Sequence, residues 1–173
     1  MAAQHRPIPK NAEALFDGCH EETLQKLELL EKILADFRYE GKTSRGKNLK
    51  GALALLDYFN CRLMDHFKME DKILFPFLIV HLPKLESVIG LLRSEHQDFR
   101  NCLRNFSKSL KNISREKTGN HQIREIEKLN EHGTYLIYLL RNHFQVESEC
   151  LYQAIDRDLH LEERKELIKR CLS

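Results

Sequence analysis

Residues 66–75 read His-Phe-Lys-Met-Glu-Asp-Lys-Ile-Leu-Phe, and residues 143–152 repeat this pattern as His-Phe-Gln-Val-Glu-Ser-Glu-Cys-Leu-Tyr. The two stretches align without a gap and share His, Phe, Glu, Leu and a terminal aromatic residue. In each stretch a glutamate follows the histidine by four residues, which on a helix places both side chains on one face, one turn apart. The repetition indicates a chain made of two structurally similar halves, each carrying the same His and Glu pair.

A further histidine precedes each copy of the motif at nearly the same distance. His20 lies 46 residues before His66, and His96 lies 47 residues before His143. About twenty residues out along one helix, about six in a turn and about twenty back return the chain to its starting level, at about 1.5 Å rise per residue. We therefore expect one layer of a helical bundle to contain six ionisable side chains: His20, His66, Glu70, His96, His143 and Glu147.

This set of side chains predicts a metal centre. Burying several imidazoles and two carboxylates in a helical core is costly unless they bind something together. Four imidazoles and two carboxylates are too many for one tetrahedral zinc ion but suit two adjacent non-haem iron ions, with the glutamates bridging and the histidines terminal. We expect neighbouring apolar side chains to form a dry shell around the ions. The candidates for this shell are Leu63, Phe67, Phe99, Leu140 and Phe144.

Composition and hydrophobic periodicity predict an all-α fold for the 173 residues, which contain only 7 Gly and 4 Pro. Apolar residues at helical spacing predict four long helices and a short, charged fifth helix packed outside a four-helix bundle. The expected helices span residues 12–37, 49–74, 83–110, 121–152 and 161–172. We expect Pro76 to disturb the end of the second helix. The predicted organisation is an irregular arm over 1–10, a di-iron domain over 11–156 and a short helix within 157–173.

The order of these motifs resembles the hemerythrin-like HHE cation-binding family. The resemblance rests on His20, on His66 to Leu78 with its Leu-Phe-Pro-x-Leu sequence, on Glu95-His96 and on His143 to Glu147. It implies an up-down-up-down bundle with an oxo- or hydroxo-bridged di-iron centre that reacts with O2, peroxide or NO. The oxygen-carrying hemerythrins of invertebrates have a second histidine one turn after the one on the third helix, where this chain has Arg100.

The pattern leaves the remaining coordination positions open. One iron needs further ligands to complete its coordination, and several alternatives exist. These are water, Glu21 or Glu22 beside His20, and Tyr58 or Tyr135, which lie two turns before the motif histidines. The thiol of Cys19 is expected to point about 100° away from His20 around the helix, and so not to bind the metal.

Other charged residues are expected to support the site or to lie outside it. Glu95, Asp65 and Asp71 are candidates for orienting the ligand imidazoles through their second ring nitrogen. The histidines outside the repeat are expected at the surface or at helix caps, namely His5, His81, His121, His132 and His160.

Three functions are compatible with this pattern. The first is a protein that binds or senses O2, NO or the redox or iron state through the two irons. The second is a di-iron enzyme that decomposes peroxide or NO, or an iron donor for iron-sulfur cluster repair. The third, a metal-free scaffold, leaves six ionisable core residues unexplained. No motif identifies a protein partner.

Charge and cysteine content limit the setting in which the protein acts. The 28 Lys and Arg are interspersed with 26 Asp and Glu, without the basic stripe typical of nucleic-acid binding. No apolar run has the length of a secretory signal core or a membrane span, which favours a cytoplasmic protein. The five widely spaced cysteines are expected to be reduced, small core residues.

Overall fold

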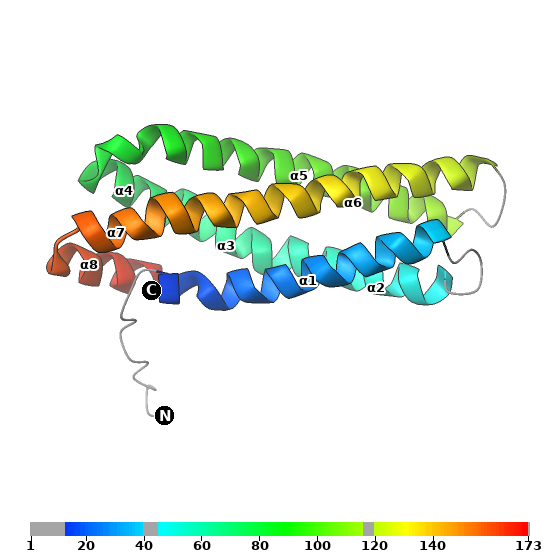
Figure 1. The fold of residues 1–173 in the computed structure, drawn as a ribbon, viewed down its shortest axis with the longest axis horizontal. Coiled ribbons are helices and arrows are strands. Elements are labelled where there is room, and N and C mark those ends of the chain that lie inside the picture. The colour runs from blue at the N-terminus through cyan, green and yellow to red at the C-terminus, as the bar shows by residue number, and fades with distance from the viewer. Residues whose placement is uncertain (1–12, 40–44, 116–119, 173) are drawn as a thin grey trace, which may run out of the picture.

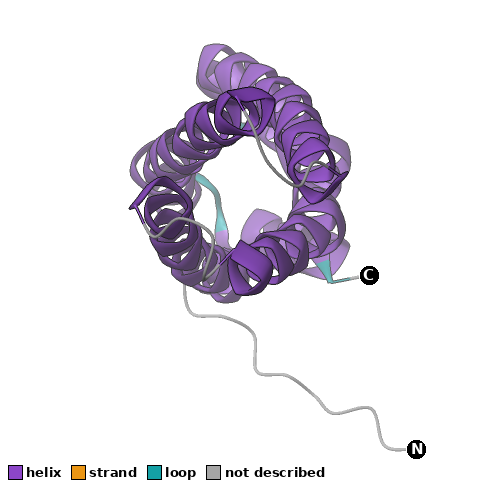
Figure 2. Ribbon diagram, turned by 90° about the vertical axis from the view of Figure 1, so that its right-hand side faces the viewer, coloured by secondary structure: helices purple, strands orange, loops and turns teal. Residues whose placement is uncertain are grey.

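The computed structural model describes residues 13–39, 45–115 and 120–172, with side chains from Gly18 onward, and these residues contain no strand. The predicted arm over residues 1–10 lies outside the described residues. Four long helical rods run up, down, up and down beside one another, and a short fifth helix follows (Figure 1). Seen from the end, the four rods form a ring around a common axis (Figure 2). The predicted all-α four-helix bundle is confirmed.

The rods are divided as follows. The first is α1 (Glu13–Tyr39), and the third is η3 (Pro83–Leu85) continued by α5 (Glu86–Arg115). The second comprises α2 (Arg45–Tyr58), η1 (Phe59–Leu63), α3 (Met64–Met69), η2 (Glu70–Leu74) and α4 (Phe75–His81). The fourth comprises α6 (Asn120–Val146), η4 (Glu147–Tyr152) and α7 (Gln153–Asp158). The fifth helix is α8 (Leu161–Cys171), and none of the described helices is long and apolar enough to span a membrane.

Apolar side chains at helical spacing attach each rod to its neighbours. On α1 the buried residues Leu27, Leu30 and Leu34 recur every three or four positions, so they lie on one face. Each such side chain contributes about 2 kcal/mol by leaving water. Leu24 and Leu53 also fall at helical spacing among the apolar residues of their helices, but they are 39% and 40% exposed. Both leucines lie at the edges of the apolar stripes of their helices. Sequence periodicity does not decide whether a side chain at such an edge faces the core or the solvent.

The second rod is longer than predicted and contains two π-helical segments, η1 and η2. It begins at Arg45 and continues through Pro76 to His81, so the expected end near Leu74 is wrong. A proline inside a regular α-helix removes a hydrogen bond and clashes with the preceding turn. Here the wide π turn of η2 ends at Leu74, which places Pro76 in the first turn of α4, where no intrahelical N–H is needed.

Among the described residues, the apolar core consists of two clusters separated by a layer of ionisable residues. The larger cluster includes Leu27, Phe59 and Phe106, and the smaller one includes Leu78 and Ile155. Helix α8 adds Leu167 to the smaller cluster. Between the clusters lie the six residues that we call the polar layer: His20, His66, Glu70, His96, His143 and Glu147.

Candidate metal centre

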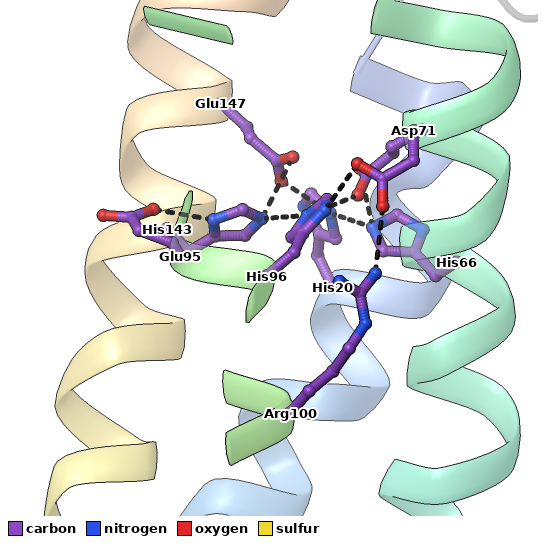
Figure 3. A network of polar contacts seen from close by, with 9 residues as sticks. His20, His66, Asp71, Glu95, His96, Arg100, His143 and Glu147 are labelled. Carbon is purple, nitrogen blue, oxygen red and sulfur yellow. Dashed lines mark hydrogen bonds and ion pairs between the residues drawn. The ribbon is translucent and has the colours of Figure 1, made fainter. Parts of the chain in front are cut away.

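All six residues of the polar layer meet in the interior of the bundle, and all four rods contribute to it. His20 comes from α1, His96 from α5, and the two His and Glu motifs from the second and fourth rods (Figure 3). His20 retains 12% exposure of its side chain, whereas both glutamate side chains are 0% exposed. The prediction from helix rise, that the four histidines return to one level, agrees with this arrangement.

The layer divides into two groups of ligand atoms that share both glutamates. In the first group the Nε2 atoms of His20 and His66 lie 3.0 Å apart. Glu147 Oε2 lies 3.3 Å from His20 Nε2, and Glu70 Oε1 lies 3.0 Å from His66 Nε2. The ligand atoms of this group are all within 4.8 Å of one another. We call it the His20/His66 subsite.

The second group uses the other oxygen of each glutamate. The Nε2 atoms of His96 and His143 lie 3.2 Å apart. Glu70 Oε2 lies 3.3 Å from His96 Nε2, and Glu147 Oε1 lies 3.3 Å from His143 Nε2. These ligand atoms also lie within 4.8 Å of one another, and we call this group the His96/His143 subsite. Each carboxylate therefore directs one oxygen to the His20/His66 subsite and the other oxygen to the His96/His143 subsite. A bridging ligand requires this arrangement.

The glutamates occupy equivalent positions in the two halves of the chain. Glu70 opens the π-helical segment η2, and Glu147 opens η4. A π turn holds one more residue than an α turn and is found frequently at functional sites. A π-helical segment therefore begins at each of the two glutamates, once in each copy of the repeated motif.

Hydrogen bonding supports the interpretation of these groups as metal ligands. All four carboxylate oxygens of Glu70 and Glu147 are buried, yet none makes a hydrogen bond of acceptable geometry. A buried carboxylate without such bonds costs several kcal/mol, roughly, unless a cation binds it. Four imidazole nitrogens converge on the same oxygens. The donor set fits two metal ions, which would supply the missing partners.

Carboxylates outside the layer fix two of the imidazoles. His96 Nδ1 lies 3.0 Å from Asp71 Oδ1, and His143 Nδ1 lies 2.8 Å from Glu95 Oε2 (Figure 3). The predictions for Asp71 and Glu95 are therefore confirmed. The prediction for Asp65 is wrong, because its side chain is 72% exposed and pairs with Lys68 on the surface.

Aromatic rings cover the imidazoles as predicted. Phe67 stacks on His96 with 3.9 Å between ring centroids, and Phe144 stacks on His20 with 4.1 Å. A further ring, Phe75, lies 5.6 Å from His96. The five apolar residues predicted to form the dry shell are all buried: Leu63, Phe67, Phe99, Leu140 and Phe144.

Burial and mutual charge shift the pKa values within the layer in the metal-free chain. Burial lowers the pKa of His96 to about 4. Burial acts in the same direction on His143, but the charge of Glu147 and the hydrogen bond to Glu95 outweigh it and raise its pKa to about 10. Burial and the charge of Glu147 raise the pKa of Glu70 well above its usual value. The metal-free layer therefore holds protons that a metal ion would displace.

The side chains that are alternatives for completing the coordination differ in their surroundings. Tyr58 exchanges a 2.9 Å hydrogen bond with Thr23, and Tyr135 is 45% exposed. Glu21 and Glu22 belong to neither metal-binding group in the described part of the chain. The sequence pattern alone does not predict the contact of Thr23 with Tyr58. Its position three residues after His20, on the same helix face, does indicate that Thr23 lies near the polar layer.

The cysteines differ from their predicted role. Cys102 is buried, and burial raises the pKa of its thiol to about 11, but Cys61 and Cys150 are exposed. The description of the cysteines as core residues is therefore wrong for these two. Cys19 is half-buried and belongs to neither metal-binding group of the described residues.

Comparison with known proteins agrees with this geometry. A search of curated proteins finds no match. The model of the hemerythrin HHE cation-binding domain matches residues 11–132. The matched span ends before His143 and Glu147, which the internal repeat identifies and which lie in the same layer as the other four residues. Because the match covers more than half of the chain, this protein belongs to the hemerythrin family of HHE cation-binding domains.

Proposed function

We propose that the chain holds two non-haem iron ions in the polar layer and uses them to bind or sense O2, NO or the redox or iron state. The observation that carries the proposal is the sharing of Glu70 and Glu147 between two pairs of histidines. Each subsite offers two imidazole nitrogens and two carboxylate oxygens. This mixed set of imidazole and carboxylate donors in a four-helix bundle is suited to iron. Structural zinc instead prefers tetrahedral sites that are often rich in thiolates.

Access for a small ligand supports this function. Two imidazoles and two carboxylate oxygens leave a six-coordinate ion with positions to spare. A surface hollow of about 500 Å³ adjoins the layer beside His20 and is lined also by Phe144, Arg141 and Ser148. The His20 side chain is 12% exposed and borders this hollow, which would let a diatomic ligand approach a metal ion held in the layer.

A second candidate, a di-iron enzyme acting on peroxide or NO, is favoured by the position of Arg100. Its guanidinium donates to Asp71 Oδ2 at 2.9 Å, and it stands where the oxygen-carrying hemerythrins have a second histidine. Both ions would therefore have only two histidines and open positions. Open positions on both ions suit a substrate that is cleaved or reduced between them. Delivery of iron for cluster repair would likewise benefit from ions that are incompletely enclosed.

Metal analysis of protein purified aerobically from iron-replete cells tests the proposal. We expect about two irons per chain, as in other carboxylate-rich helical bundles. A single stoichiometric zinc would contradict it. Addition of O2 or NO to the reduced protein should change the visible spectrum reversibly if the chain binds or senses the gas. Sustained consumption of peroxide or NO would instead select the enzyme. Glu147→Ala should abolish either response.

A further inference from the structure

His96 and His143 are held more firmly than His20 of the other subsite. In the His96/His143 subsite both rings are at most 1% exposed, and a carboxylate contacts the Nδ1 atom of each. A hydrogen bond from Nδ1 fixes the ring orientation, leaves Nε2 free to bind a metal and makes that nitrogen a stronger donor. Both imidazoles of this subsite are thus prepared for an ion before it arrives.

Arg100 reinforces one of these contacts. Asp71 follows Glu70 in η2, whereas Arg100 lies one turn after His96 on α5. Asp71 uses Oδ1 to contact His96 and Oδ2 to accept from Arg100 at 2.9 Å (Figure 3). The aspartate is therefore held from two sides by one helix. Since Asp71 and Glu70 are adjacent, the same contact also fixes the segment that carries a shared glutamate.

His20 in the other subsite lacks this support. Its polar contacts run through Nε2, to His66 and Glu147, and no carboxylate of the described residues contacts its Nδ1. Its ring is held by stacking on Phe144, beside the surface hollow. Stacking restrains the plane of the ring, but it does not select which nitrogen carries the proton.

We propose that the two subsites are unequal, and that Asp71, held by Arg100, together with Glu95 makes the His96/His143 subsite the first to fill and the last to lose its ion. The inference rests on the proposed di-iron function. Asp71 and Glu95 act as positioning residues, because they contact the histidines and belong to neither metal-binding group of the described residues. Loss of such a partner typically weakens metal binding by about 10- to 100-fold.

Anaerobic titration of the metal-free full-length protein with ⁵⁷Fe(II) tests the order of filling. Competition with a chromophoric chelator measures the two stepwise dissociation constants, and Mössbauer spectra report which environment is occupied. With one equivalent of iron we expect one dominant quadrupole doublet, and with two equivalents a second doublet. In Asp71→Asn or Glu95→Gln the first dissociation constant should rise about 10- to 100-fold, with the first equivalent divided between both environments.

Asp65→Asn is the matched control, since it removes the same charge from an exposed aspartate on the same rod. It should leave both binding steps unchanged. Two equal steps in the wild-type protein, or unchanged filling order in both positioning variants, would overturn the inference while leaving a two-iron centre intact. Saturation at fewer than two irons would overturn the proposed function itself. Circular dichroism of the metal-free variants separates a local effect from unfolding, and Glu95→Gln on α5 provides a test independent of η2.

Discussion

The ring of Phe144 lies face to face with His20, with 20° between the planes, although its neighbour in the chain is His143. Phe67 does the same for His96, while its own neighbour is His66. Each motif therefore supplies a ring that supports a histidine from the other half of the chain. The two halves are joined through these stacked pairs as well as through the shared glutamates.

Truncation of Phe144 should destabilise the bundle and the centre together. Phe144 is 5% exposed, so Phe144→Ala leaves a cavity, and we expect the free energy of unfolding to fall by about 3–5 kcal/mol. His20 should also lose its restraint, which accelerates iron release to a chelator. Urea denaturation measures the first effect. Tyr138→Ala, at a 65% exposed position on the same helix, should change stability by less than about 0.5 kcal/mol.

Removal of either shared carboxylate should empty both subsites. Glu70→Ala and Glu147→Ala each delete one oxygen from each group of ligands, so we expect both variants to lose most of their iron. His66→Ala and His143→Ala should act similarly. The iron-to-protein ratio after purification checks this, and far-ultraviolet circular dichroism should remain strongly helical because apolar packing supplies most of the stability.

Matched substitutions outside the polar layer should leave the iron content unchanged. His81 contacts Glu163 of α8, His132 lies on α6 away from both groups, and Cys19 belongs to neither. His81→Ala, His132→Ala and Cys19→Ser are therefore expected to retain about two irons per chain. Full iron in Glu70→Ala combined with loss of iron in His132→Ala would show that the ligand assignment is wrong.

Metal binding should release protons near neutral pH. In the metal-free chain the pKa of His143 is about 10 and that of Glu70 is raised, so both groups tend to hold a proton that must leave when they become ligands. Affinity should therefore fall as pH decreases. Titration with Fe(II) in weakly buffered, anaerobic solution with an indicator dye should detect about two protons per filled centre. Binding without acidification would contradict the protonation of these residues.

The same shift has a consequence for the metal-free protein. Because the folded-state pKa of His143 lies above its usual value of 6.5, protonation of this histidine favours folding at low and neutral pH. That contribution is complete below pH 6.5 and disappears as the pH rises through about 10. Removing the metal should therefore produce a protein whose melting temperature falls in mildly alkaline buffer, as differential scanning calorimetry would measure.

Two glycines should respond in opposite directions to the same substitution. A Cβ at Gly133 would lie 2.6 Å from Leu34 Cδ1, so Gly133→Ala should cost about 1–3 kcal/mol by forcing α1 and α6 apart. A Cβ at Gly90 meets nothing within 4 Å, and Gly90→Ala should stabilise α5 by up to about 1 kcal/mol. Thermal denaturation compares the two, and equal effects would exclude the close approach at Gly133 as the cause.

The sequence predicts the residues of the polar layer and two carboxylates that support it, Asp71 and Glu95, but not the π-helical segments or the contact of Asp71 with Arg100. The layer follows from the constant rise of a helix and from the repeat, so the meeting of His20 with His66 needs no knowledge of packing. The π segments could not be predicted, because an additional residue in one turn depends on the surrounding packing and not on local propensity. The contact between Asp71 and Arg100 joins side chains of different rods, so it likewise depends on how the rods pack.

The position of the polar layer affects how the chain unfolds. Apolar contacts form two separate clusters, and the layer between them contributes charge and not hydrophobic cohesion. With ions bound, the ligands from all four rods connect the two clusters, and the domain should melt in a single cooperative step. Without ions this connection is weaker, and the smaller cluster, which includes Leu78, Ile155 and Leu167, becomes a foldon able to open before the larger one. Metal occupancy would then set the cooperativity of the domain as well as its chemistry.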